Sequence, residues 1–126
     1  MVMAAYGLPK AAEAEKAQRQ EAIQAALQEA TRVPLSTLQQ AVDLLPATLR
    51  VVEKGNPNAR SDAASSYFLL QAAADGAVLN VKINLASIKD EEFKRDITAA
   101  LRQAEGARRD LERRARELLA KYFPDA

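Results

Sequence analysis

The chain has 126 residues, of which 48% are apolar and 28% charged, with a formal net charge of +1. Because it contains no cysteine and no histidine, the sequence excludes disulfides, thiolate or imidazole metal sites, and serine–histidine–aspartate catalysis. We expect no metal, and this net charge selects neither nucleic acid nor a membrane as a partner. No stretch approaches the ~18 apolar residues of a membrane span, so the sequence predicts one soluble, cytoplasmic domain over residues 1–126.

Apolar residues recur with helical spacing along nearly the whole chain, and no stretch alternates as a strand would. The first long helix is predicted over residues 11–54. Pro34 and Pro46 lie inside it, and neither can donate to the carbonyl four residues earlier. Because the apolar stripe keeps its phase across both prolines, the pattern favours one bent helix, with a break near Val33 as the alternative.

A turn is predicted at residues 55–58, where Gly55 suits a left-handed helix C-cap. Ser61 is the candidate N-cap of the next helix, and Asp62 lies in its first turn. A turn that carries polar side chains to a helix N-terminus can bind an anion or a polar ligand edge, but an ordinary capped helix start explains the same pattern. The candidate residues of this turn are Asn56, Asn58, Ser61 and Asp62.

The second long helix, residues 62–88, is apolar around most of its circumference, with Phe68, Val78 and Val81 on its expected packing side. Such a helix is normally central and covered on several sides. One narrow stripe of small and polar residues interrupts the apolar surface and predicts the floor of a groove. The residues of this stripe are Asp62, Ser66, Ala73, Gly76, Asn80, Asn84 and Ser87.

Asn80 and Asn84 lie one helical turn apart, so their amides can contact the same edge of a ligand. The alternative is that they bond backbone or partner-helix groups in a buried seam. Asp62 is the only acid of the stripe and the best acid–base candidate, although its first-turn position favours an electrostatic role. It lies ~27 Å from Asn80 along the helix axis. The two residues therefore serve different parts of a long ligand or meet across a dimer interface.

The last helix is predicted from about Glu91 to Tyr122, with a heptad-like apolar seam that Arg108 interrupts. We interpret its arginines, residues 108–116, as a solvated face rather than a nucleic-acid surface, because no aromatic residues interleave to stack bases. Helices this long and apolar predict an all-α bundle that is completed by homodimerisation. The opposite-charge pairs expected on the outer face are Glu91/Arg95, Asp110/Arg114, Glu112/Arg116 and Glu117/Lys121.

Three segments, GNPNARSDA (55–63), GAVLNVKINL (76–85) and IKDEEF (88–93), resemble the cyclodeaminase/cyclohydrolase family. This is the C-terminal domain of formiminotransferase-cyclodeaminase and also occurs as methenyltetrahydrofolate cyclohydrolase. The resemblance covers essentially the whole chain. It implies an all-α domain that dimerises, with a tetrahydrofolate derivative as substrate in a groove at the subunit interface.

The activities implied by the resemblance are ammonia loss from 5-formimino-tetrahydrofolate and hydrolysis of 5,10-methenyl-tetrahydrofolate. Matched by position, Asn56, Ser61 and Asp62 belong to the turn motif of the family, and Asn80 and Asn84 to its central-helix motif. With Asn58 of the same turn, the asparagines and Ser61 are the expected substrate-binding residues. Asp62 is the expected catalytic residue.

The resemblance also implies a Gly-rich loop and an acidic segment before the region that this sequence matches. Neither is present in the 126 residues, so we expect an N-terminally truncated copy that is incomplete for catalysis. The alternative is a non-catalytic helical module that binds folate or mediates oligomerisation.

Overall fold

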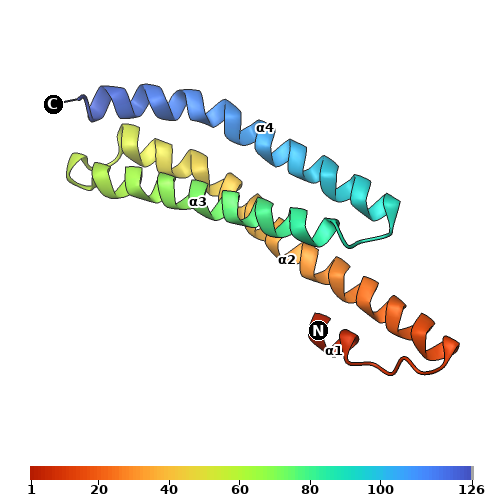
Figure 1. Ribbon diagram of the computed structural model, residues 1–126. Helices are drawn as coiled ribbons and strands as arrows, with labels where there is room; N and C mark the ends of the chain where they lie inside the picture. The colour runs from red at the N-terminus through yellow and green to blue at the C-terminus, as the bar shows by residue number, and fades with distance from the viewer. Residues whose placement is uncertain (126) are drawn as a thin grey trace.

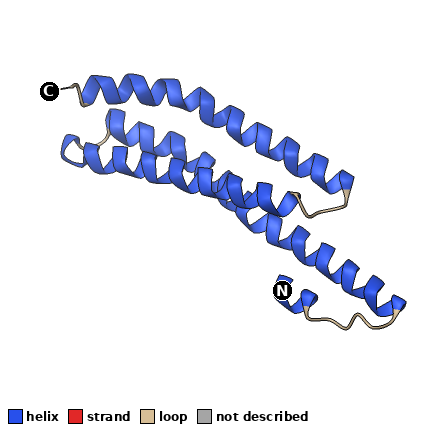
Figure 2. Ribbon diagram, in the orientation of Figure 1, coloured by secondary structure: helices blue, strands red, loops and turns tan. Residues whose placement is uncertain are grey.

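The computed structural model describes residues 1–125, which form helices and no strand (Figures 1 and 2). The predicted all-α class is therefore confirmed. Two long helices form a hairpin, and a third runs back along them, packing more closely against the first than against the second. The elements are α1 (Val2–Tyr6), α2 (Glu13–Lys54), the 3-10 turn η1 (Pro57–Ala59), α3 (Arg60–Leu85) and α4 (Glu91–Tyr122).

Helix α2 runs for 42 residues without a break, and both Pro34 and Pro46 lie inside it. The prediction of one helix is confirmed, and the alternative of a break near Val33 is wrong. The helix survives because its apolar stripe is buried along most of its length, which outweighs the two missing backbone hydrogen bonds. At its start, the Glu15 carboxylate accepts from the backbone amides of residues 11 and 12 at 3.0 and 3.1 Å.

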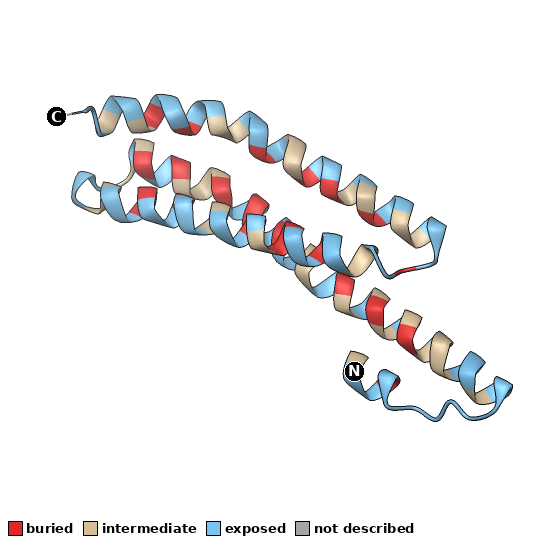
Figure 3. Cartoon of the chain, viewed as in Figure 1, coloured by how far each residue is buried: buried red, intermediate tan, exposed pale blue. Residues whose placement is uncertain are grey.

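The core lies along the inner faces of the three long helices in consecutive clusters, as the buried residues in Figure 3 show. At the N-terminal end, Ala5 of α1 packs with α2 and with the loop after α3. The middle cluster joins all three long helices. Its buried members are Leu38, Ala41, Val42, Ala74, Ala77, Val78, Val81, Ile97, Leu101 and Ala104.

One side of α3 is uncovered, contrary to the expectation of a helix enclosed on several sides. Phe68, predicted to pack beside Val78, is 56% exposed. It lies about 80° from Val78 around the helix, and the buried arc extends from Val78 away from it. Phe68 and three other large apolar residues on the same side of α3 are exposed, and are called here the α3 stripe: Phe68, Leu69, Leu79 and Ile83.

The turn between α2 and α3 differs from its prediction in two respects. Gly55 has φ −77°, so it is not a left-handed cap. A glycine is needed there because an added Cβ would lie 2.5 Å from the Val51 carbonyl oxygen. Ser61 is not the N-cap, because Pro57 starts a 3-10 turn that leads directly into α3. Asn56 caps that turn, its Oδ1 accepting from the Asn58 amide at 3.0 Å.

Helix α4 begins and ends as predicted, with Asp90 as its N-cap. Of its four predicted surface pairs, Glu112/Arg116 is confirmed, and in two others one residue takes a different partner. Glu112 and Arg116 are 4.0 Å apart, whereas Arg114 bonds Glu53 of α2 at 2.8 Å. In place of Arg95, Lys94 pairs with Glu91 at 2.9 Å. For Arg114, the i,i+4 spacing was overridden because α2 places a carboxylate within reach.

Candidate functional site

An open groove of about 460 Å³ lies between α2 and α3, along the half of α3 that is farther from the α2–α3 turn. Four residues of the predicted stripe line its α3 side, so the expected groove floor exists. The α2 side is apolar apart from one hydroxyl. The lining residues are Ala30, Val33, Pro34, Thr37, Ala73, Gly76, Ala77, Asn80 and Asn84.

Pro34 decides how the two walls of the groove are joined. A proline has no backbone N–H, so the Ala30 carbonyl, four residues earlier, cannot receive its usual helical hydrogen bond. The Asn84 side chain of α3 supplies the missing donor, with Nδ2 3.1 Å from the Ala30 oxygen. The alternative of a bond to a backbone group of the neighbouring helix is therefore correct for one N–H of Asn84, although this residue is half-buried rather than buried.

Asn80 is exposed and bonds within its own helix, its Nδ2 donating to the Gly76 carbonyl at 2.9 Å. Both amides thus present polar atoms to the same groove, one turn apart. None of the lining residues is titratable. Among the side chains that the structure describes there, the groove can orient a ligand through hydrogen bonds but has no acid or base of its own.

The turn residues lie at the opposite end of α3 from Asn84 (Figure 1). Asp62 is exposed, and its carbonyl accepts from the Ser66 hydroxyl at 2.9 Å. Ser61 is also exposed and helical. Since α3 is continuous, Asp62 and Asn80 are ~27 Å apart along its axis. One chain therefore does not bring the expected catalytic residue to the groove.

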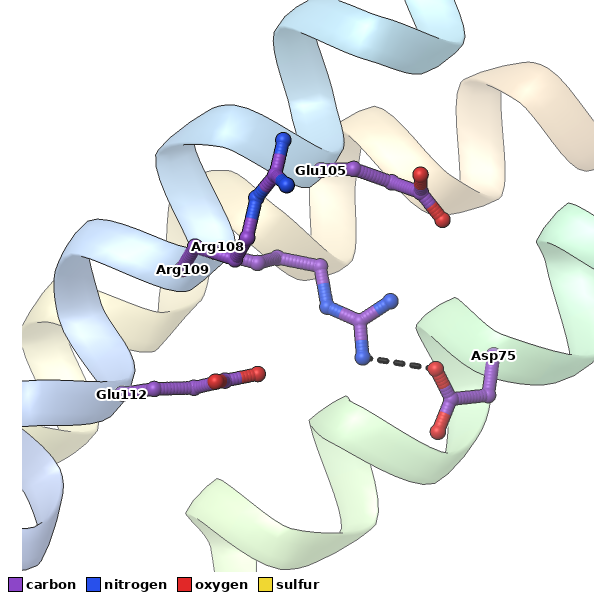
Figure 4. A pocket seen from close by; sticks show the side chains of 5 residues that line it. All are labelled: Asp75, Glu105, Arg108, Arg109 and Glu112. Atoms are coloured by element: carbon purple, nitrogen blue, oxygen red, sulfur yellow. Dashed lines mark hydrogen bonds and ion pairs between the residues drawn. The ribbon is translucent and has the colours of Figure 1, made fainter.

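A second polar site, not predicted from the sequence, joins α3 and α4 (Figure 4). Arg108, expected on a solvated face, is instead 8% exposed. Its Nε donates to Gln71 at 2.9 Å, its Nη2 contacts Asp75 at 2.7 Å, and Gln71 in turn donates to the Tyr67 hydroxyl at 2.9 Å. The signal for this site was the arginine in the apolar seam, because a charge there needs a partner on the facing helix.

Tyr67 is buried, and its hydroxyl is the last acceptor of this hydrogen-bond network. Burial raises the pKa of the Tyr67 hydroxyl above 10.0, and the hydrogen bond from Gln71 partly opposes the rise. The adjoining cavity of about 250 Å³ is lined by Asp75 and four charged residues of α4, two of each sign (Figure 4). Because these charges largely balance, the cavity has no strong preference for an anion or a cation.

Neither a metal-binding cluster nor a membrane-spanning helix is found among the described residues. Within residues 1–125, carboxylates do not gather in groups of three or more that could hold a metal ion. Over the same residues, no helix combines the length and the apolar character needed to cross a membrane.

Comparison with known proteins shows similarity over most of the chain. Residues 1–103 match the family model described as formiminotransferase-cyclodeaminase. A methenyltetrahydrofolate cyclohydrolase of Methylorubrum extorquens is 39% identical over 105 residues, which are 83% of this chain and 49% of that protein. Formimidoyltransferase-cyclodeaminases of Sus scrofa and Gallus gallus are 34% and 36% identical over 74% and 73% of this chain.

The chain spans about half the length of that cyclohydrolase and 17% of each of the two longer relatives. The match includes the turn, the whole of α3 and residues 91–103 of α4. It also includes Pro34 and both groove asparagines. On this evidence the chain belongs to the formiminotransferase-cyclodeaminase family.

Proposed function

We propose that this chain is a folate-binding part of a one-carbon enzyme and that its α2–α3 groove holds a tetrahydrofolate derivative. The observation that carries the proposal is the placement of Asn80 and Asn84 in one groove with apolar walls. A flat heterocycle with a polar edge suits such a surface, since its faces contact apolar side chains and its edge meets the amides. The name of one relative, a methenyltetrahydrofolate cyclohydrolase, supports this choice of ligand.

The same proposal includes homodimerisation through the α3 stripe. Phe68 and Ile83 lie almost symmetrically about Gly76, so two antiparallel copies of α3 bring Phe68 of one against Ile83 of the other. This pairing covers four large apolar side chains per copy. It also places Asp62 of the second copy toward Asn84 of the first, which brings the acid to the groove that lacks one.

Binding is tested by calorimetric titration with 5-formyltetrahydrofolate, a stable tetrahydrofolate derivative. Gly76→Leu fills the groove, because nothing lies within 4 Å of an added Cβ and the side chain extends into the open space. We expect at least a tenfold loss of affinity. Gly106→Leu is the matched control, since that glycine is also helical and unobstructed but lies on α4. Equal affinity of both variants would disprove the groove as the binding site.

A second candidate function is a folate-binding module without catalysis. The lack of titratable groups in the groove favours it. The two functions are separated by incubating the chain with 5,10-methenyl-tetrahydrofolate and following its near-ultraviolet absorbance. Binding without turnover supports the non-catalytic module. Turnover that is lost in Asp62→Asn, with 5-formyltetrahydrofolate affinity retained, supports the enzyme.

A further inference from the structure

We infer that Pro34 is a positioning residue for Asn84: the proline withholds the helical hydrogen bond from the Ala30 carbonyl, and that carbonyl fixes the amide that meets the ligand. This inference rests on the proposed function, because it assigns to Pro34 and Ala30 a role in the same groove. The supporting distance is 3.1 Å between Asn84 Nδ2 and the Ala30 oxygen, between residues 54 apart in sequence.

The chemistry of the carbonyl settles which end of the Asn84 amide faces it. A backbone carbonyl oxygen only accepts, so the amide must turn its nitrogen toward Ala30. The amide oxygen of Asn84 then lies on the other side of the group and remains an acceptor. A ligand in the groove can therefore donate an N–H or O–H to this oxygen, or accept from the second N–H of the Asn84 amide.

Helix α2 contains a second internal proline, Pro46, which serves as a control for the general effect of a proline on helix stability. Pro34 lines the groove beside Ala30, whereas Pro46 is not among the groove residues. Pro46 leaves the Val42 carbonyl without its helical hydrogen bond, as Pro34 does for Ala30. Within the described residues, however, no side-chain donor bonds the Val42 carbonyl, whereas Asn84 bonds the Ala30 carbonyl. Of the two prolines, only Pro34 leaves a carbonyl that is hydrogen-bonded by a side chain of α3.

The first test is a double-mutant cycle on stability, which needs no ligand. Asn84→Ala leaves the Ala30 carbonyl without its side-chain partner, so it lowers the thermal midpoint in the parent chain. In a Pro34→Ala background the restored N–H of residue 34 serves that carbonyl, and the loss caused by Asn84→Ala shrinks or disappears. In a Pro46→Ala background the loss keeps its full size. An equal loss in all three backgrounds would overturn the inference.

The second test measures the NMR signals of the Asn84 side chain and, separately, the affinity for the ligand. In Pro34→Ala, the side-chain NH₂ signals of Asn84 move toward those of a solvent-exposed amide, while Pro46→Ala leaves them in place. Affinity for 5-formyltetrahydrofolate falls roughly three- to tenfold in Pro34→Ala, the range for one hydrogen bond, and is unchanged in Pro46→Ala. Because alanine is the better helix former, the thermal midpoint of Pro34→Ala does not fall.

The outcomes keep the inference and the proposed function apart. If the parent chain does not bind the folate but the stability cycle shows coupling and the amide signals move, the positioning contact stands and the ligand assignment fails. If Pro34→Ala binds the folate as tightly as the parent, or leaves the Asn84 signals unmoved, the positioning role is wrong.

Discussion

Single residues in this chain are selected by their immediate neighbours more than by their usual preferences. Gly55 looks like a left-handed cap in the sequence, yet its φ is −77° and any residue could adopt it. Its requirement is spatial, because the Val51 carbonyl approaches where a Cβ would be. Arg108 looks like a surface charge, yet it is buried against Gln71 and Asp75. In both cases the deciding atom belongs to another turn or another helix.

We expect Gly55→Ala to destabilise the chain by roughly 1–3 kcal/mol, because its Cβ would lie 2.5 Å from a backbone oxygen that cannot move freely. Gly106→Ala, with open space at its Cβ, should instead stabilise α4 by roughly 0.5–1 kcal/mol. Urea unfolding of both variants measures the difference. A neutral Gly55→Ala would show that the turn relaxes without cost.

The raised pKa of Tyr67 predicts a loss of stability at alkaline pH. Burial keeps this hydroxyl protonated in the folded chain at a pH where it ionises in the unfolded chain. The contribution of the Tyr67 hydroxyl to the free energy of unfolding is therefore fully present below pH 10, and it is lost as the pH rises through the raised pKa. Urea unfolding between pH 9 and pH 11.5 should show a shallower fall for Tyr67→Phe than for the parent. Tyr6→Phe, at a residue 48% exposed, is the control and should keep the parent slope.

At the scale of the element, burial of apolar stripes decides where the helices run. Helix α2 crosses two prolines because Leu38, Leu45 and Leu49 on one face are almost fully buried. Its last carbonyls are bonded by side chains of the other helices, Arg60 of α3 to Val52 and Tyr122 of α4 to Glu53. The end of α2 is therefore fixed by tertiary contacts as well as by the turn that follows.

Leu44 and Leu45, one exposed and one buried, test whether the apolar stripe of α2 is buried as the structure shows. Leu45→Ala removes a side chain that is 0% exposed and should cost roughly 2–5 kcal/mol. Leu44→Ala, at a position 53% exposed, should cost less than about 1 kcal/mol. Thermal unfolding of the two variants checks the assignment. If they cost the same, Leu44 is buried in an assembly that one chain does not show.

At the scale of the whole molecule, the α3 stripe predicts a specific antiparallel pairing of two copies. Because the chain has no cysteine, introduced cysteines report this pairing without interference. Gly76→Cys lies near the proposed two-fold axis and should cross-link to its own copy under mild oxidation. Ser61→Cys, far from the axis on the same helix, should not. A chain that sediments as a monomer at micromolar concentration would contradict the pairing.

The expected site was predictable in part. The stripe containing Gly76, Asn80 and Asn84 was visible from helical spacing, and the structure opens a groove at that place. The proline that frees the Ala30 carbonyl was also visible. Its partner was not, because Asn84 is 54 residues away and no local pattern pairs the two. The ligand roles of Asn56, Asn58, Ser61 and Asp62 stay predictions, as do the single domain and the second copy.

The sequence by itself determined the three long helices, with their ends to within three residues, and the all-α class, because the hydrophobic period acts over a few residues along the chain. The short helix α1 was not predicted. The sequence also carried the family resemblance, since the motifs are local. Only the tertiary structure decided which face of α3 is uncovered and why Gly55 is a glycine. It also decided that Arg108 is buried and that Asn84 replaces the donor that Pro34 lacks. These outcomes depend on atoms that come together only when the helices pack, which the spacing within one helix does not encode.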